Sequence, residues 1–383
     1  MPYLEKISPS FIPLSLYIHI PWCIRKCPYC DFNSHTLKTD LNESRYIDSL
    51  IADFQSSLNY IQNRPIHSIF FGGGTPSLFK PESYERLLSA IFKEVSVVDN
   101  LEITLEANPG TVDEHYFKGY RTIGINRLSL GVQSFDTEKL KKLGRIHTAE
   151  QATNAFHVAQ QAGFNNINID LMFGLPDQSL EEALLDLSQA VALNPTHLSW
   201  YQLTLEPNTV FYKYPPVLPN EDKLWEIETQ GKQFIEKHYQ QYEISAYSKK
   251  NQQCQHNLNY WLFGDYLGIG AGAHGKITTN NNILRTQKKR QPEDYMNGEK
   301  NFVAKEEVIS PKEISFEFIL NASRLHQAIP YSLLEERAGL SYSAIEAHLL
   351  KAESKGLVEI RECDFEITSL GHRYLNNVQE LFL

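Results

Sequence analysis

The passage Cys23-Ile24-Arg25-Lys26-Cys27-Pro28-Tyr29-Cys30 decides how this chain folds and what it can hold. It places three cysteines within eight residues, directly after the strand-like apolar run Leu14-Ser15-Leu16-Tyr17-Ile18-His19-Ile20. Cysteine thiolates at short spacings hold iron–sulfur clusters, and four of them normally close a four-iron cluster. Three thiolates would bind three irons and leave the fourth iron open to another ligand, which is where chemistry would occur.

Two other interpretations of these cysteines exist. One is a structural zinc site that borrows Cys254 or Cys363, and the other is a chance group of buried thiols. Zinc ribbons usually present two C-x2-C pairs, and neither remote cysteine has such a partner. The spacing therefore favours an iron–sulfur cluster.

Composition limits the class of protein. With 383 residues and 42% hydrophobic composition, the chain can form two domains with sizeable cores, which excludes a disordered or fibrous protein. The odd number of five cysteines, and a start that lacks a signal-peptide pattern, predict a reducing cytoplasmic location. No apolar stretch is long enough to cross a bilayer, but peripheral membrane contact stays open.

The charge balance argues against a nucleic-acid partner. The formal net charge is -10, whereas non-specific affinity for phosphate backbones comes from clustered lysine and arginine. The one conspicuous basic run, Lys288-Lys289-Arg290, is expected to be a solvated loop beside Pro292.

From about residue 14 to 205, short β-rich runs alternate with helical periodicity, which is typical of a parallel sheet with crossover helices. The predicted strands are 16–20, 68–71, 101–106, 127–132, 166–171 and 197–204. Six βα units fall short of the eight that close a barrel, so an open partial barrel is expected.

The expected helices carry start and end signals. Capping boxes are predicted at three pairs of positions: Thr111 with Glu114, Thr148 with Gln151, and Ser179 with Glu182. Apolar residues recur at helical spacing over 46–61 and 84–95, another helix is expected over 221–239, and Gly144 and Gly163 stand where helices should end.

The chain divides into three predicted parts. Residues 1–240 form the barrel core, residues 241–306 a connecting segment that ends in a linker over 280–306, and residues 307–383 a C-terminal domain. The last part reads as two helices, a strand pair at 357–361 and 365–368, and a final helix through residue 383, which is the order of a winged helix. Acidic residues outnumber basic ones there, which favours packing or covering a substrate over binding DNA.

Ligand contacts in parallel α/β barrels come from the C-terminal ends of the strands. Glycine-rich or polar groups follow most of the predicted strands, as in Gly72-Gly73-Gly74-Thr75-Pro76 after the second strand and Glu106-Ala107-Asn108-Pro109 after the third. Singly, each has an ordinary explanation: a turn, a helix cap or, for Arg145, a surface charge. Their joint placement after the three cysteines predicts one ligand site.

The C-x3-C-x2-C spacing and these strand-end motifs resemble the radical S-adenosylmethionine (SAM) superfamily. The resemblance implies a 4Fe-4S cluster on Cys23, Cys27 and Cys30, with the amino and carboxylate groups of SAM on the open iron. A reduced cluster would then break the sulfonium C–S bond and give a deoxyadenosyl radical. The SAM contacts that the resemblance implies are Tyr17, Tyr29, Gly73, Gly74, Thr75, Glu106, Gln133, Arg145 and Asp170.

The whole chain also resembles the group formed by oxygen-independent coproporphyrinogen III oxidase and the HemW-type heme chaperones. The oxidase typically has a fourth cysteine where this chain has Phe32, and a longer segment before the first strand. The segment His256-Asn257-Leu258-Asn259-Tyr260-Trp261 looks like the His-Asn-Trp motif associated with heme binding in the chaperones. These features favour a heme chaperone that passes heme to acceptor apoproteins, with the oxidase as the alternative and no catalytic residue assigned.

His256 is the expected heme contact, because a neutral imidazole is a common axial ligand and the adjacent aromatic residues offer flat apolar surface. The alternative is a hydrogen-bonded structural histidine. Cys254 could either ligate heme or be a buried thiol, and the sequence does not decide between these roles. His274 is expected to be structural. The heme acceptor, covalent attachment, SAM cleavage and oligomeric state stay open.

Overall fold

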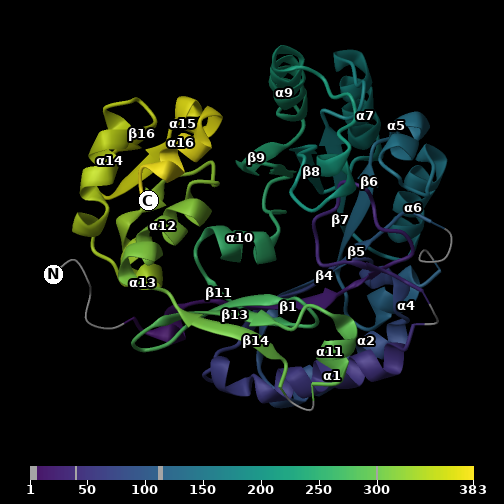
Figure 1. Cartoon of the computed structure of the whole chain (residues 1–383), viewed down its shortest axis with the longest axis horizontal. Coiled ribbons are helices and arrows are strands. Elements are labelled where there is room, and N and C mark those ends of the chain that lie inside the picture. Colours follow the sequence, from purple (N-terminus) through teal and green to yellow (C-terminus); the bar gives the residue numbers. More distant parts are fainter. Residues whose placement is uncertain (1–6, 39–40, 111–114, 299–300) are drawn as a thin grey trace.

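A curved sheet with helices on its outer side forms most of the molecule (Figure 1). The computed structural model describes residues 7–38, 41–110, 115–298 and 301–383. In the described part of the chain, no helix combines the length and apolar composition needed to traverse a lipid bilayer.

Among the described residues, twelve strands form this sheet, in the order β14-β13-β12-β11-β1-β4-β5-β6-β7-β8-β10-β9. The strands β1, β4, β5, β6, β7 and β8 are parallel, and β11 adds a parallel neighbour to β1. The bounds are β1 Leu14–Ile20, β4 Ile66–Gly73, β5 Val97–Ala107, β6 Arg127–Gln133, β7 Asn166–Phe173, β8 His197–Gln202, β9 Gln240–Glu243, β10 Ala246–Ser248, β11 Asp265–Ile269, β12 His274–Thr278, β13 Ile283–Lys288 and β14 Val303–Val308. The six predicted strands and the open partial barrel are thereby confirmed.

Most helices of the barrel pack on the outer face of the sheet, whereas α10 lies inside its curve (Figure 1). Their bounds are α1 Glu43–Ser56, α2 Pro81–Glu94, α4 Phe117–Thr122, α5 Thr137–Lys142, α6 Ala149–Gln161, α7 Leu180–Leu193, α8 Val210–Lys213, α9 Glu221–Ile235, α10 Gln255–Trp261 and α11 Pro292–Met296, with 3-10 turns Pro9–Phe11, Leu58–Tyr60 and Pro76–Leu78. The capping boxes at Thr148 and Ser179 are present. The one predicted at Thr111 and Glu114 lies outside the described residues.

The predicted linker over 280–306 is wrong, because β13, α11 and β14 occupy this segment and β13 and β14 extend the sheet. Lys288, expected in a solvated loop, ends β13 with its ammonium buried against Asp53, which also accepts a hydrogen bond from Tyr295 Oη at 2.7 Å. The strand β13 is polar and is stabilised by the distant Asp53 carboxylate. The pattern of apolar residues in this segment therefore did not predict a strand.

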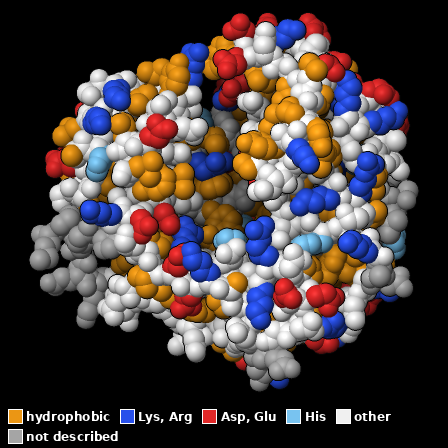
Figure 2. Space-filling view, viewed as in Figure 1, with side chains coloured by type: hydrophobic (Ala, Val, Ile, Leu, Met, Phe, Trp, Pro, Cys, Tyr) orange, Lys and Arg blue, Asp and Glu red, His pale blue; other side chains and the backbone are white. Residues whose placement is uncertain are grey.

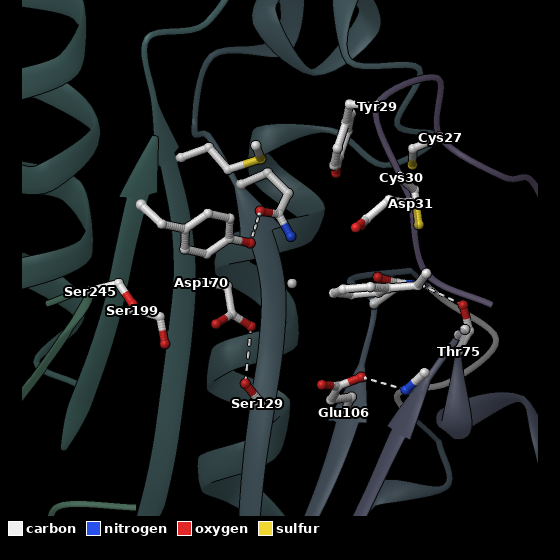
Figure 3. Close-up of a pocket in the computed structure, with 18 of the residues that line it drawn as sticks. Cys27, Tyr29, Cys30, Asp31, Thr75, Glu106, Ser129, Asp170, Ser199 and Ser245 are labelled. Carbon is white, nitrogen blue, oxygen red and sulfur yellow. Dashed lines mark hydrogen bonds between the residues drawn. The ribbon is translucent and has the colours of Figure 1, made fainter. Parts of the chain in front are cut away.

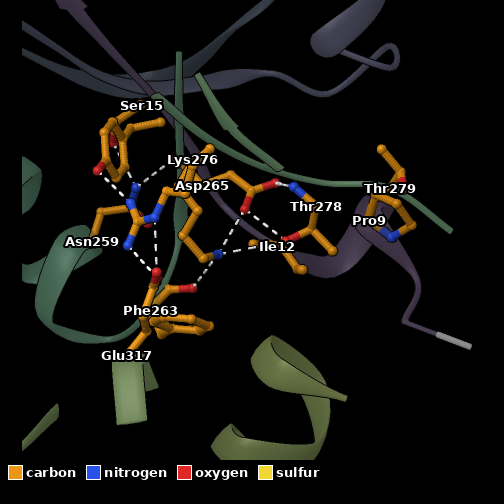
Figure 4. A network of polar contacts seen from close by, with 12 residues as sticks. Pro9, Ile12, Ser15, Asn259, Phe263, Asp265, Lys276, Thr278, Thr279 and Glu317 are labelled. Carbon is orange, nitrogen blue, oxygen red and sulfur yellow. Dashed lines mark hydrogen bonds and ion pairs between the residues drawn. The ribbon is translucent and has the colours of Figure 1, made fainter. Parts of the chain in front are cut away.

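A buried ionic network fixes the start of β11 (Figure 4). The Asp265 carboxylate accepts hydrogen bonds from Arg64 Nη1 at 2.8 Å, Lys276 Nζ at 2.9 Å and the Thr278 main-chain N–H at 2.8 Å. Asn259 of α10 donates to the Asp265 carbonyl at 2.7 Å and to Ser15 Oγ at 2.9 Å. The network therefore ties α10 to β1 and β11, inside the curve of the sheet.

The C-terminal elements form a smaller unit beside the open side of the sheet (Figure 1). They are α12 Pro311–Ala322, α13 Tyr331–Ala338, the 3-10 turn Tyr342–Ala344, α14 Glu346–Glu353, α15 Ser369–Arg373 and α16 Leu375–Glu380, with β15 Ile329–Pro330, β16 Val358–Ile360 and β17 Asp364–Ile367 as a small sheet in the order β15-β17-β16. This order of helices and hairpin is that of a winged helix. The expected single final helix is two short ones, α15 and α16, and the domain boundaries at 240 and 306 stay predictions.

Candidate functional site

A cavity of about 400 Å³ lies at the C-terminal ends of the parallel strands, a volume within the range of small-molecule sites. Figure 3 shows the cysteine loop and Tyr29 on one side of it and the carboxylates of Glu106 and Asp170 on the other. The predicted site residues that line this cavity are Cys23, Cys27, Cys30, Tyr29, Gly73, Gly74, Thr75, Glu106, Gln133, Arg145 and Asp170. Two predicted residues, Tyr17 and His256, lie elsewhere.

The cysteine loop leaves β1 through a short strand, β2 Trp22–Cys23, which pairs with β3 His35–Thr36. Lys26 Nζ holds the far side of the loop by donating to the carbonyls of Phe32 at 3.0 Å and Ser34 at 3.2 Å. All three thiols are partly exposed, and burial raises the pKa of the Cys23 and Cys30 thiols. Since ligation requires thiolates, metal binding here would release protons.

These thiols fit a cluster better than a single ion. In the described part of the chain, no three His, Cys, Asp or Glu side chains converge closely enough to hold one metal ion. A cluster takes one thiolate at each of several irons, so its ligands do not have to meet at one point. The three cysteines lie on the wall of one cavity that also offers polar groups for a further ligand.

Arg145 connects the cysteine loop to the strand ends. Its guanidinium donates to Asn108 Oδ1 at 2.7 Å and to the Gly131 carbonyl at 2.6 Å, and its Nη1 lies 3.8 Å from Cys27 Sγ. Gly144, at φ +72°, lets the preceding turn pack on the loop, since a Cβ there would lie 2.7 Å from Pro28 Cδ. Arg145 is therefore a positive charge that is fixed beside the thiols, and the alternative of an ordinary surface charge is wrong.

The glycines after β4 allow two backbones to approach closely. A Cβ on Gly73, at φ +118°, would lie 2.5 Å from the His19 ring, and one on Gly74 would lie 2.5 Å from the Trp22 carbonyl oxygen. The Thr75 N–H donates to that carbonyl at 2.7 Å, which pins the turn to the start of the cysteine loop. The turn and the loop are thus built as one wall.

Two carboxylates face the cavity from neighbouring strands. Glu106 accepts the Gly73 N–H at 3.1 Å, and burial together with the nearby charge of Asp170 raises the pKa of Glu106 to about 7. Burial also raises the pKa of Asp170, although Ser129 Oγ at 2.9 Å and Asn168 Nδ2 at 2.8 Å donate to it. Both groups are therefore ready to accept hydrogen bonds from a polyhydroxyl ligand, which would lower the cost of their ionisation.

Gln133 and Tyr29 complete the wall. The β6 register shifts between Leu130 and Gln133, and Gln133 adopts φ +69°, which turns its amide toward Tyr201. Tyr201 Oη donates to Gln133 Oε1 at 2.8 Å. Tyr29 packs near Phe211, with ring centroids 6.3 Å apart.

The predicted list of SAM contacts leaves out several groups of this wall. Asn108 donates to Thr75 Oγ1 at 2.8 Å while accepting from Arg145, so it joins two predicted residues. Asp31 points its carboxylate toward the cavity (Figure 3), and Asn257 of α10 also lines it. Asn108 follows a strand end, where ligand contacts are expected in a parallel barrel, so the sequence could have indicated it. Nothing in the local sequence indicates that Asp31 faces the cavity.

Tyr17 lines a second, adjoining cavity instead of the first. Its ring stacks on Phe70 with centroids 6.3 Å apart, and its hydroxyl shares a 3.0 Å hydrogen bond with His19 Nδ1. The second cavity is bounded on its other side by Asn321 of α12.

The predicted heme contact His256 takes a structural position. Its side chain is 1% exposed, and its ring nitrogens are hydrogen-bonded to Ser68 Oγ and Tyr260 Oη, both at 2.9 Å. Burial lowers the pKa of His256 to about 3, so the ring is neutral, but neither nitrogen is free for a metal. Cys254 is buried as well, 3.5 Å from Glu102 Oε1, and burial raises its pKa to about 12. In this structure both residues hold α10 against the sheet.

Comparison with known proteins agrees with the family resemblance that the sequence motifs predict. The model of the radical SAM superfamily matches residues 17–187. The chain is 51% identical to heme chaperone HemW of Haemophilus influenzae, over 98% of this chain and 99% of the relative, and 50% identical to heme chaperone HemW of Escherichia coli, over 97% and 98%. Among solved structures, it resembles coproporphyrinogen III oxidase (HemN) from Escherichia coli with a TM-score of 0.83 at 23% identity, over 98% of this chain and 91% of that one. This last likeness shows a shared fold.

Proposed function

Because this chain belongs to the HemW family of the radical SAM superfamily, we propose that it is a heme chaperone, which binds heme and transfers it to acceptor apoproteins. The observation that carries the proposal is the 51% identity to HemW of Haemophilus influenzae, which extends over both the barrel and the C-terminal unit. The fold alone would equally accommodate the oxidase, so the function rests on the full-length similarity.

The first cavity is proposed to hold the 4Fe-4S cluster and SAM. Cys23, Cys27 and Cys30 supply three thiolates, and SAM occupies the open iron through its amino and carboxylate groups. When bound, the cluster and SAM together supply one-electron chemistry. The protein's part is to hold them and to exclude competing ligands from the open corner.

Several groups on the wall have a proposed partner on SAM. The carbonyls of the Gly73–Gly74 turn receive its ammonium, and the fixed guanidinium of Arg145 suits its carboxylate. Glu106, Gln133 and Asp170 suit the ribose hydroxyls, and the Tyr29 ring lies where an adenine can pack. The raised pKa of Glu106 supports this role, because hydroxyl donors stabilise the carboxylate that burial disfavours.

The cluster and SAM are proposed to control the state or assembly of the chaperone, in a reducing, cytoplasmic environment that keeps the three free thiols available. We also propose that the protein can contact a membrane surface, or associate with a second copy of itself, when it delivers heme to an acceptor. Centrifugation with anionic vesicles and the mass of the reconstituted protein in solution would measure them.

The decisive experiment uses one anaerobically reconstituted sample of the full chain. Hemin titration should shift the Soret band to saturation at one heme per chain, and heme should then pass to an added apoprotein acceptor. Absence of saturable hemin binding would refute the chaperone function.

The same sample tests the oxidase alternative. Incubation with coproporphyrinogen III, SAM and a reductant should yield no decarboxylated product, while deoxyadenosine is measured in parallel. Steady turnover of coproporphyrinogen III would overturn the chaperone proposal in favour of the enzyme.

A further inference from the structure

The second cavity, of about 680 Å³, is larger than the first and lies on the side of β11, β12 and α12. Figure 2 shows the face of the molecule hollowed near its centre, between the C-terminal unit and the barrel. Aromatic side chains make up much of the cavity wall: Tyr17, Phe32, Tyr260, Trp261 and Tyr266. Such a volume lined by aromatic faces suits a large, flat, mostly apolar ligand.

Among the described residues, two histidines line this cavity, and they differ in what their rings contact. The ring nitrogens of His19 are both engaged, with Tyr17 Oη at 3.0 Å and the Asn33 carbonyl at 2.9 Å. His274 is exposed, and within the described part of the chain its ring makes no hydrogen bond or ion pair. Since an axial ligand needs a free nitrogen lone pair, His274 can ligate iron here and His19 cannot.

The backbone of His274 is held firmly although its side chain is open. It begins β12 and pairs with Gln287 of β13. A Cβ on Gly268 would lie only 2.0 Å from the His274 carbonyl oxygen, so β11 packs directly on this peptide. The imidazole therefore extends from a strand end whose backbone is fixed, and a fixed backbone is what a metal ligand requires.

The wall carries the carboxyl groups of Asp31 and Glu106 and one guanidinium, that of Arg290, which suits a propionate group of a porphyrin. Arg290 is exposed and lines the cavity, and no carboxylate in the described part of the chain lies within ion-pair distance of it. Arg285, by contrast, is paired with Glu317 and donates to Tyr266 Oη at 2.6 Å. The cavity wall covers part of the otherwise exposed His274 ring, and this partial burial, together with the two arginines, lowers the pKa of His274 and favours the neutral form that binds iron.

The two cavities share part of their walls. Asp31, Phe32, Gly73, Glu106 and Trp261 border both of them. Phe32 is 59% exposed, which is unusual for a large aromatic side chain, and a flat ligand in the second cavity would cover it.

We infer that heme binds in this second cavity, with a ring nitrogen of His274 as axial ligand to the iron and Arg290 paired with a propionate. The inference rests on the proposed chaperone function and deepens it by naming the site. His256 then acts as a positioning residue: its ring holds the hydroxyl of Tyr260, and Tyr260 lines the cavity. Heme bound there lies against the same Phe32 and Trp261 that border the cluster cavity.

The test is hemin titration of the full chain with its cluster reconstituted, read by the Soret band and by electron paramagnetic resonance of the ferric heme. His274→Ala should abolish the imidazole–iron signature and raise the Kd about tenfold or more. Added free imidazole should restore the signature in this variant, which a merely structural role would not allow. Arg290→Gln should raise the Kd by up to about fivefold and leave the spectrum unchanged.

His157→Ala is the matched control, because His157 is an exposed histidine on α6, outside both cavities, and its loss should change nothing. An unchanged spectrum and Kd for His274→Ala would overturn the inference while leaving the chaperone function intact. Loss of the iron signature in His256→Ala that free imidazole restores, with unchanged iron content and thermal unfolding, would also overturn it, because His256 would then be the ligand. If the unaltered protein binds no hemin, the inference and the proposed function fall together.

Discussion

Replacing Glu106 by glutamine tests how the first cavity is built. The pKa of Glu106 stands at about 7 against an ordinary 4.5, first because the carboxyl is buried and then because Asp170 lies nearby. Between these pH values the unfolded chain releases a proton that the folded chain keeps. The folded state therefore loses stability as pH rises, by about 1.4 kcal/mol per pH unit and about 3 kcal/mol in total, and then levels off above the folded pKa.

Glu106→Gln removes this pH dependence because the amide does not ionise, and its oxygen can still accept the Gly73 N–H. From about pH 5 to pH 7.5 the variant should gain about 2–3 kcal/mol of unfolding free energy relative to the unaltered protein. The assay is urea unfolding of the reduced, cluster-free chain, followed by circular dichroism at several pH values. Glu138→Gln is the control, since Glu138 is an exposed partner of Lys141 and its variant should run parallel to the unaltered protein.

A constant difference between Glu106→Gln and the unaltered protein over this pH range would refute the reasoning. The reasoning would also be refuted if Glu106→Gln lost stability relative to the unaltered protein as pH rises. The Glu106 carboxylate of the unaltered protein would then be stabilised by its surroundings. SAM and cluster binding should reduce the pH dependence of the unaltered protein, since ligand hydroxyls favour the ionised form.

Three further changes probe the rest of the framework. Asp265→Ala leaves two buried cations without their carboxylate and should cost about 3–5 kcal/mol of unfolding free energy, and a loss below about 1 kcal/mol would contradict the network. Gly73→Ala places a Cβ 2.5 Å from the His19 ring at φ +118° and should cost about 1–3 kcal/mol, with weaker SAM binding by calorimetry; unchanged stability would show that the turn relaxes freely. Cys27→Ser should hold less than about half of the iron after reconstitution while its circular dichroism stays unchanged, and full iron content would rule out Cys27 as a ligand.

Local patterns were sufficient to predict much of the barrel. The parallel strands are short apolar runs bounded by turns, and the capping boxes at Thr148 and Ser179 depend on residues three positions apart. The strand β13 could not be predicted in this way. Its Lys288 is buried because Asp53, 235 positions away, supplies the opposite charge, and a pattern of neighbouring residues does not contain that partner.

The first cavity was predictable because the carboxyl ends of parallel strands meet at one edge of the sheet. Thus Gly73, Glu106, Gln133 and Asp170, far apart in sequence, line one wall. Asp31 escaped prediction because its direction depends on how the cysteine loop folds back.

The sequence by itself determined the cofactor chemistry: Cys23, Cys27 and Cys30 are available at a spacing that fits a cluster with an open iron, and that spacing is local. Only the tertiary structure decided which of His256 and His274 has its ring nitrogens hydrogen-bonded within the described part of the chain. His256 stands in the more suggestive motif, but its nitrogens are taken by Tyr260 and by Ser68, 188 positions away. His274 stands among glycines, and its ring is open to the larger cavity. The physical reason is that ligation requires an unshared lone pair, and whether a lone pair is shared depends on partners that the fold brings together.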